Sequence, residues 1–201
     1  MDIDVTFISD PGCPCGYSAG PSLAALQWRY GLRLRWRLVT IGLAEDASMY
    51  ESRGYDPIMM GQRMEMFRQF GMPFTQGPRE RLTGTGRACR ALHAVRLLHP
   101  GDEITAFRAL QLGWFTTRML MDEDDNIATA LGRVPGLDVA QVMATIDTPG
   151  DEAHPWLGKD LKSLFLTKET KDGLRVAVAT RKTSDGPRGF EEAVIIEELD
   201  P

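Results

Sequence analysis

Residues 3–18 read IDVTFISDPGCPCGYS, and this stretch decides how the rest of the chain is interpreted. Its first part, Ile3 to Ile8, is short and rich in β-branched and aromatic residues, which predicts a strand. Asp10-Pro11-Gly12 then predicts a turn. Cys13-Pro14-Cys15 follows at once, so two thiols flank a proline in the connection that leaves the first strand.

A helix and a second strand are expected after the cysteines. Pro21 suits a first helical turn, because its missing N–H would have no partner there. Apolar residues continue at helical spacing as far as Gly31, which is typical of a helix end. Leu32 to Leu43 alternates between apolar residues and arginines, which predicts a strand with one polar face. The connection is long enough for a right-handed crossover, so the two strands are expected to be parallel.

The remainder divides into a helical middle and a β-rich end. Residues 56–148 are predicted to be a run of helices without strands, at 58–70, 86–98, 103–121, 124–131 and 138–146. Leu174 to Thr180 and Ala193 to Ile196 are predicted strands. We therefore expect an α/β fold in which a large α-helical insertion separates an N-terminal βαβ segment from a C-terminal ββ segment.

Three regions are expected within one domain. Residues 1–55 would form the βαβ segment with an active-site loop at 10–18, and residues 56–148 the insertion. Residues 149–201 would form a C-terminal helix and the ββ segment that completes the sheet. This order places the loop after the first strand at the carboxyl edge of the sheet, where open α/β folds carry their sites.

The strongest chemical signal is the position of Cys13 at the start of a helix. Unpaired N–H groups and the positive end of the helix dipole both favour a thiolate there, and the thiolate is the nucleophilic form. The alternative is that Cys13 and Cys15 are small buried residues beside a turn. Asp10 either tunes or deprotonates Cys13, or it caps the turn.

These residues resemble a known family. Asp10-Pro11-Gly12-Cys13-Pro14 followed by Tyr17, directly after an N-terminal strand, is similar to the active-site start of the DsbA-like thioredoxin superfamily, in particular its cytoplasmic FrnE-type dithiol–disulfide oxidoreductases. The resemblance implies a thioredoxin-like fold with a helical insertion and a thiol–disulfide oxidoreductase activity. It also implies Cys13 and Cys15 as catalytic residues, with Pro14, Tyr17 and Asp10 in support. No tightly bound cofactor is expected, and glutathione or mycothiol is a candidate co-substrate.

The chain departs from the family pattern at two points. The family has Cys-Pro-x-Cys, whereas this chain has Cys13-Pro14-Cys15-Gly16, so Gly16 stands at the position of the resolving cysteine. Three ways to resolve Cys13 stay open: a labile bond to Cys15, a small thiol, or Cys89 from the helical region. The family also has a cis-proline before its third strand, and Pro187 is the weak candidate for it here.

Two further functions stay open. Kappa-class glutathione transferases and hydroxychromene-carboxylate isomerases resemble the same superfamily and need no second cysteine, which fits Gly16. A thioredoxin-fold binding protein without catalysis is the third alternative. A protein disulfide or a small thiol is the expected partner, and a monomer and a homodimer are both compatible with the sequence.

Composition excludes several other classes. The net charge of −5 disfavours a nucleic-acid partner, and no apolar run is long enough for a membrane span. Three cysteines and an N-terminus without a signal-peptide pattern indicate a cytoplasmic protein without a disulfide framework. The histidines share no zinc spacing with the cysteines, so no metal is expected. The methionines between Met59 and Met72 either pack in the core, which is favoured, or line an apolar groove near the active site.

Overall fold

The computed structural model describes residues 3–146, 152–157, 163–170, 173–180 and 194–196. The chain forms two compact units, unit 1 over Met1–Ile146 and unit 2 over Asp147–Pro201. Across these described segments, no helix has the length and apolar character needed to cross a membrane.

Unit 1 begins with the predicted βαβ segment. Its elements are β1 (Ile3–Ser9), α1 (Pro14–Ser18), α2 (Gly20–Tyr30), the short 3-10 helix η1 (Gly31–Arg33) and β2 (Leu34–Thr40). The two strands are parallel and in register from Ile3 opposite Leu34 to Ser9 opposite Thr40, as the crossover argument predicts. In β2 the arginines are exposed while the apolar residues between them are wholly or partly buried, so the predicted alternation is confirmed.

The region expected to be helical contains helices and no strands. These helices are α4 (Pro57–Met66), η2 (Phe67–Phe70), α5 (Gly86–Leu98), η3 (Pro100–Asp102), α6 (Glu103–Thr116), α7 (Asp124–Leu131) and α8 (Val139–Ile146). A further short helix, α3 (Ser48–Glu51), precedes this region and was not predicted. Helix α6 ends five residues before the predicted boundary at 121. The hydroxyls of Thr116 and Thr117 donate to the carbonyls of Leu112 and Gly113, and Thr117 adopts an extended conformation that stops the helix.

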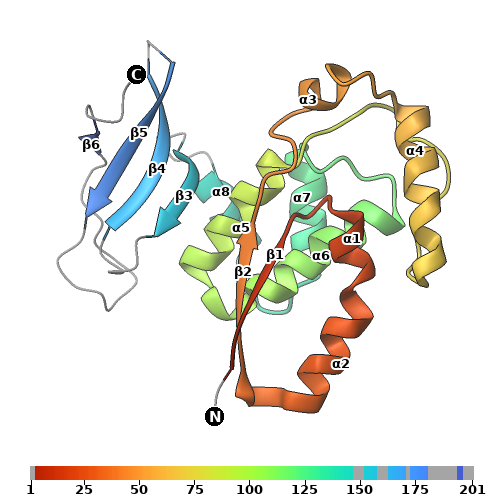
Figure 1. The fold of residues 1–201 in the computed structure, drawn as a ribbon, viewed down its shortest axis with the longest axis horizontal. Coiled ribbons are helices and arrows are strands. Elements are labelled where there is room, and N and C mark those ends of the chain that lie inside the picture. The colour runs from red at the N-terminus through yellow and green to blue at the C-terminus, as the bar shows by residue number, and fades with distance from the viewer. Residues whose placement is uncertain (1–2, 147–151, 158–162, 171–172, 181–193, 197–201) are drawn as a thin grey trace. The chain divides into compact units, whose positions relative to one another are not determined.

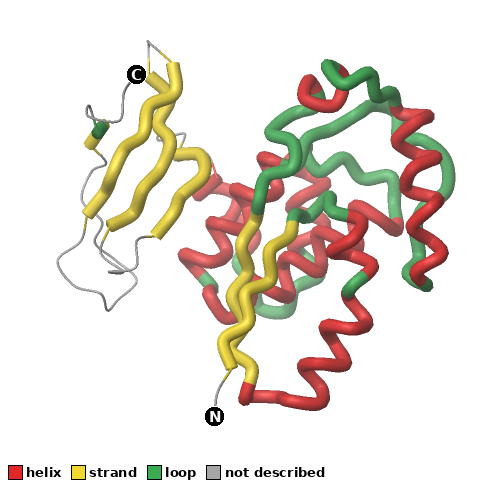
Figure 2. The backbone as a smooth tube through the Cα atoms, viewed as in Figure 1, coloured by secondary structure: helices red, strands yellow, loops and turns green. Residues whose placement is uncertain are grey.

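The helices α5 and α6 cover one face of the β1–β2 pair (Figure 1). The rings of Phe7 on β1 and Phe107 on α6 meet edge to face at 5.8 Å. Arg96 on α5 donates to the carbonyl of Leu38 on β2 at 2.9 Å. This helix-on-sheet layer holds the carboxyl end of β1 against the insertion, where the loop to α1 begins (Figure 2).

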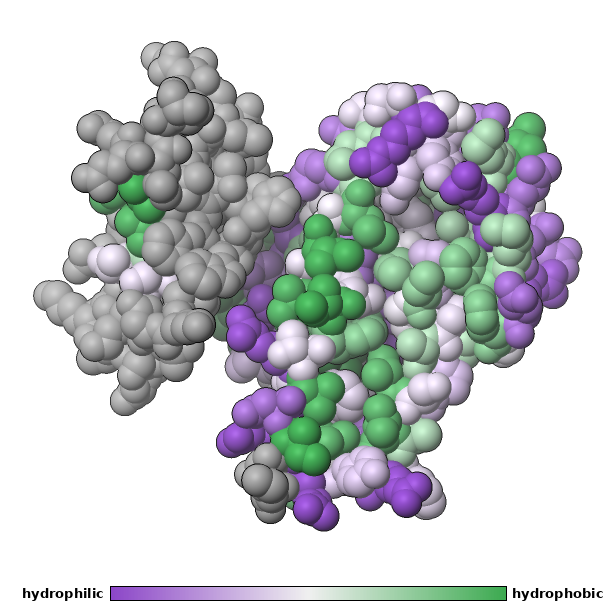
Figure 3. Space-filling view, viewed as in Figure 1, coloured by the Kyte–Doolittle hydropathy of each residue, from purple (hydrophilic) through white to green (hydrophobic). Residues whose placement is uncertain are grey.

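The opposite face of the strand pair is largely polar, with Arg35 and Arg37 exposed beside the apolar Ile8. Ile8 follows Phe7 along β1, so it points away from α6, and it is 62% exposed. Figure 3 shows apolar surface along this part of unit 1. A parallel pair with only one covered face is unusual, because parallel strands are normally buried on both sides.

Unit 2 is an antiparallel sheet in the order β3 (Glu152–Leu157), β4 (Ser163–Thr170), β5 (Gly173–Thr180) and β6 (Val194–Ile195). The two predicted C-terminal strands are confirmed as β5 and β6. The described residues 152–157 and 163–170 form β3 and β4 where a C-terminal helix was expected, and elsewhere in 149–201 that helix stays a prediction. Among the described residues, β1–β2 and β3–β6 are separate hydrogen-bonded sheets. The division at 55 and 148, and the completion of one sheet by residues 149–201, stay predictions, and Pro187 lies outside the described residues.

Candidate functional site

A tight turn carries the chain from β1 into α1. The N–H of Cys13 donates to the carbonyl of Asp10 at 3.0 Å, which closes the turn. The N–H of Gly12 donates to the Asp10 carboxylate at 2.7 Å, so the side chain of Asp10 braces the same turn. Asp10 therefore caps the turn, which is one of the two roles the sequence left open.

Cys13 is the N-cap residue of α1. Its backbone is extended, and its Sγ accepts the N–H of Gly16 at 3.4 Å. Pro14 occupies the first helical position, where it removes no hydrogen bond. A donor aimed at the sulfur stabilises a thiolate more than a thiol, so this geometry suits a nucleophilic sulfur. The prediction that Cys13 stands at a helix start is confirmed.

Cys15 differs from Cys13 in exposure and electrostatics. Cys13 is partly buried, whereas Cys15 is exposed, and both are free thiols. Desolvation and the neighbouring sulfur of Cys13 raise the pKa of Cys15 above its ordinary value. At neutral pH Cys15 is therefore a weaker nucleophile than a free cysteine.

Gly16 stands where the family has its resolving cysteine, and space there is restricted. A Cβ placed at Gly16 would lie 2.1 Å from Oγ of Ser9, so any side chain would require Ser9 to move. The same Cβ would lie 3.7 Å from Cβ of Cys13, a separation typical of a disulfide. The hydroxyl of Ser9 is buried and has no hydrogen-bond partner within the described ranges.

The carboxylate of Asp10 joins three segments. It is fully buried, and it accepts the N–H of Leu43 at 2.9 Å and the hydroxyl of Thr85 at 3.0 Å. Cys89 Sγ lies 3.6 Å from the same carboxylate oxygen. Burial and the Asp10 charge raise the pKa of Cys89 well above its ordinary value. Asp10 thus anchors the active-site turn to the insertion, and Cys89 is held as a protonated thiol.

Tyr17 is a core residue of the helical region. It is fully buried, stacks on Phe115 at 4.6 Å, and its hydroxyl donates to the carbonyl of Pro73 at 2.9 Å. The guanidinium of Arg108 lies over the ring, 4.9 Å from its centre. Tyr17 therefore supports the site from beneath, by fixing α1 against α6 and the loop before residue 74.

A cavity of about 240 Å³ opens beside the active-site turn. Its lining includes Gly12 and Pro14 from the turn and Met60 and Met64 from α4. Two of the methionines therefore line a groove near the active site, although core packing was favoured from the sequence. The remaining lining residues are Leu43, Tyr50, Tyr55, Pro57, Gly61, Arg63, Phe67, Arg79, Arg81, Leu82, Thr83 and Trp114.

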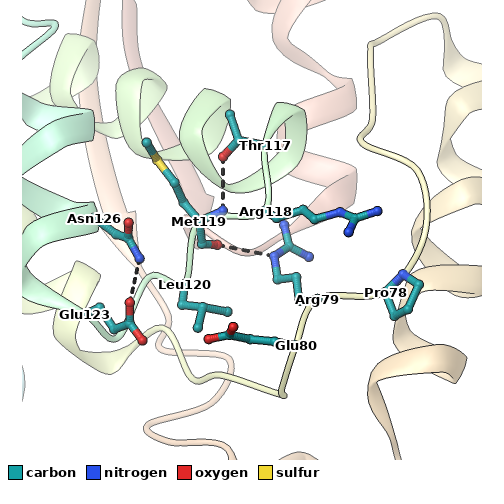
Figure 4. A pocket seen from close by; sticks show the side chains of 9 residues that line it. All are labelled: Pro78, Arg79, Glu80, Thr117, Arg118, Met119, Leu120, Glu123 and Asn126. Atoms are coloured by element: carbon teal, nitrogen blue, oxygen red, sulfur yellow. Dashed lines mark hydrogen bonds between the residues drawn. The ribbon is translucent and has the colours of Figure 1, made fainter.

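A second cavity of about 560 Å³ shares Arg79 with the first and contains no cysteine. Arg79 extends from the loop before α5 toward the loop after α6, where its Nε donates to the carbonyl of Met119 at 3.3 Å (Figure 4). The surrounding residues are Pro78, Glu80, Thr117, Arg118, Leu120, Glu123 and Asn126. Within the described segments, no group of three or more histidine, cysteine or carboxylate side chains could hold a metal ion.

The sequence reasoning missed Tyr50, Arg79 and Trp114 as residues of this site. Burial, together with the charges of Asp10 and Cys13, raises the pKa of Tyr50, so its hydroxyl stays protonated beside the turn. Trp114 packs under the turn, with a ring atom 3.7 Å from where a Cβ on Gly12 would stand. These residues come from three distant segments, and no local motif marks them.

No model of a protein family matches the sequence, and neither does any curated protein. Several solved structures do match. A candidate protein disulfide isomerase from Nitrosomonas europaea superposes with a TM-score of 0.60 at 13% identity, over 92% of this chain and 93% of that one.

Two more neighbours share this architecture. The cytosolic disulfide reductase DsbM from Pseudomonas aeruginosa, solved with GSH, matches with a TM-score of 0.55 at 18% identity over 73% of each chain. A candidate DsbA oxidoreductase from Streptomyces coelicolor matches with a TM-score of 0.55 at 19% identity, over 73% of this chain and 68% of that one. The chain therefore shares the fold of these disulfide reductases and oxidoreductases, as the resemblance of its active-site sequence implied.

Proposed function

We propose that this protein is a thiol–disulfide oxidoreductase in which Cys13 is the nucleophile. The observation that carries the proposal is the Gly16 N–H aimed at Sγ of Cys13, at the start of α1 and beside a cavity. The fold supports it, because the solved structures that share this fold include disulfide reductases and oxidoreductases.

The reaction proceeds by two thiol–disulfide exchanges. The Cys13 thiolate attacks one sulfur of a disulfide, forms a mixed disulfide, and releases the other half as a thiolate. A second thiolate then attacks the mixed disulfide and frees Cys13. One such cycle converts the substrate disulfide and one thiol into a thiol and a new mixed disulfide. A second molecule of the small thiol then attacks that mixed disulfide, so two small thiols lose the two electrons that the substrate disulfide gains and leave as their own disulfide.

A low-molecular-weight thiol is the proposed resolving group. Cys89 is a poor candidate, because burial and the charge of Asp10 keep it protonated. Cys15 is also a poor candidate for the resolving group. It lies one residue before Gly16, the helical position that faces Cys13, and its raised pKa lowers its thiolate fraction at neutral pH. A small thiol needs only access to the exposed side of the mixed disulfide.

Turnover of a neutral disulfide, 2-hydroxyethyl disulfide, with glutathione as the reductant tests the proposal. Cys13→Ser should abolish turnover, whereas Cys15→Ser and Cys89→Ser should keep most of it. Mass spectrometry of the wild-type protein with limiting thiol should find the mixed disulfide on Cys13. Undiminished turnover by Cys13→Ser would refute the assignment.

A glutathione-dependent transferase or isomerase is the second candidate. It is favoured by Gly16, where Ser9 occupies the space that a second cysteine would need. Such an enzyme would bind glutathione at the start of α1 without redox change at Cys13. Glutathione binding combined with an unchanged thiol count after turnover would select this function.

A further inference from the structure

We propose that Arg79 and Arg63 form a carboxylate-binding subsite in the cavity beside Cys13, so that the preferred substrate is an anionic peptide-type thiol or disulfide. This inference rests on the proposed oxidoreductase function and adds the chemical class of the substrate. It is carried by two arginines that line one wall of the cavity without a carboxylate partner among the described residues.

Arg79 is held rigidly next to the active-site turn. Its guanidinium lies over the ring of Trp114, 4.6 Å from the ring centre, and Trp114 in turn packs beneath Gly12. Its Nε and Nη2 donate to the backbone carbonyls of Met119 and Trp114. An arginine side chain has five N–H donors. The two on Nη1 of Arg79 have no acceptor in the part of the chain that the structure describes.

A buried guanidinium without a counter-ion is costly, because desolvation is not offset by an opposite charge. Burial lowers the pKa of Arg79 to about 10, so the side chain is still a cation at neutral pH. A substrate carboxylate would supply the missing charge and acceptors. Arginine suits this task, since its planar fork binds a carboxylate with two parallel hydrogen bonds.

Arg63 adds a second cation at the same cavity. It lies on α4 with its guanidinium over the ring of Tyr55, 4.6 Å from the ring centre, and it also donates to the Tyr55 hydroxyl. Arg81 contributes less, because Asp122 and Glu123 already neutralise it. The residues that line this cavity include no aspartate or glutamate, so its wall is cationic.

The lining of the cavity thus combines apolar methionine and proline side chains, including Pro14 next to Cys13 in the chain, with the two cationic side chains. A tripeptide thiol of the glutathione type fits this pattern, because its thiol lies in the middle and its carboxylates at the ends. A thiol built on neutral sugars, such as mycothiol, would leave both arginines without a counter-ion. The structure therefore favours glutathione over mycothiol among the two candidate co-substrates.

Paired kinetics with two disulfides test the subsite. Glutathione disulfide carries carboxylates, whereas 2-hydroxyethyl disulfide is neutral and needs no arginine. Arg63→Met and Arg79→Lys should each lower kcat/KM for glutathione disulfide by about tenfold or more, the loss expected for a charge-assisted hydrogen bond. Neither should change kcat/KM for 2-hydroxyethyl disulfide, measured with a neutral dithiol as reductant. Arg68→Met, an exposed arginine outside the cavity lining, is the matched control and should leave both values unchanged.

Binding of S-methylglutathione, which has no free thiol, separates this inference from the proposed function. Calorimetry should show binding to the wild-type protein and to Cys13→Ser, and binding weakened about tenfold or more in Arg63→Met. If the wild-type protein turns over neither disulfide, the oxidoreductase proposal fails, while arginine-dependent binding still supports the subsite. Equal losses for both disulfides, or no loss for either, would overturn the subsite. So would S-methylglutathione binding that is absent or independent of Arg63.

Discussion

Restoring the family's second cysteine is the sharpest test of the active-site geometry. In Gly16→Cys, the new Cβ would stand 3.7 Å from Cβ of Cys13, within the range of a disulfide. The same Cβ would stand 2.1 Å from Oγ of Ser9, so the single variant is overpacked. Such overpacking costs about 1–3 kcal/mol of unfolding free energy.

Adding Ser9→Ala removes this obstruction at little cost. The Ser9 hydroxyl is buried and makes no hydrogen bond within the described residues, so its loss breaks no interaction. Cβ of residue 9 then lies 3.3 Å from the new Cβ, a contact that a shift of a few tenths of an ångström relieves. Closing the short loop between positions 13 and 16 should stabilise the oxidised double variant by about 2 kcal/mol over its reduced form.

Thiol counting and urea unfolding provide the readouts. After oxidation with glutathione disulfide and removal of small thiols, the double variant should carry an internal bond between positions 13 and 16, identified by peptide mass spectrometry. Ser9→Ala alone should unfold at the same or a higher urea concentration than the wild-type protein. Failure of the double variant to form the bond would refute the Cys13–Gly16 geometry. Wild-type stability and efficient bond formation in Gly16→Cys alone would refute the role of Ser9.

Three more outcomes are expected from the site. Cys13→Ser removes the neighbouring sulfur that helps to raise the pKa of Cys15, so the pKa of Cys15 should fall. Iodoacetamide should then label Cys15 faster at pH 8, and an unchanged labelling rate would contradict the effect of Cys13 on Cys15. Asp10→Asn places an amide N–H group against the N–H of Leu43 and the hydroxyl of Thr85, which both donate to the Asp10 carboxylate in the wild-type protein. The variant should lose about 2–4 kcal/mol of unfolding free energy, measured in urea, and wild-type stability would exclude the bracing role. Tyr17→Phe loses the hydrogen bond to the carbonyl of Pro73 and should lower the unfolding free energy by about 1 kcal/mol, with kcat for a neutral disulfide unchanged. A large loss of kcat at unchanged stability would instead give Tyr17 a part in the reaction.

Local sequence was sufficient for the start of the site. The turn at Asp10, the N-cap position of Cys13 and the first helical position of Pro14 depend on hydrogen bonds between residues a few positions apart. The parallel pairing of β1 with β2 followed from the length and handedness of a crossover, which is equally local in origin.

Strands β3 and β4 could not be predicted in the same way. Strand propensity depends strongly on the neighbouring strand, and β4 pairs with β5 along its whole length from Ser163 to Thr170. A segment read alone does not reveal that partner. For residues 149–201 the sequence alone therefore predicts two strands and a C-terminal helix rather than four strands.

By itself, the sequence of this protein determined which sulfur begins the helix, because caps and turns are encoded by neighbouring residues. The thioredoxin-like fold was implied by the resemblance of the motif at residues 10–17. Only the tertiary structure decided what surrounds that sulfur. It brought Arg79 and Trp114 to the turn, placed Cys89 against Asp10, and set Ser9 opposite Gly16. These contacts join residues from separate segments, and their positions depend on how the helices pack over β1 and β2 rather than on any motif.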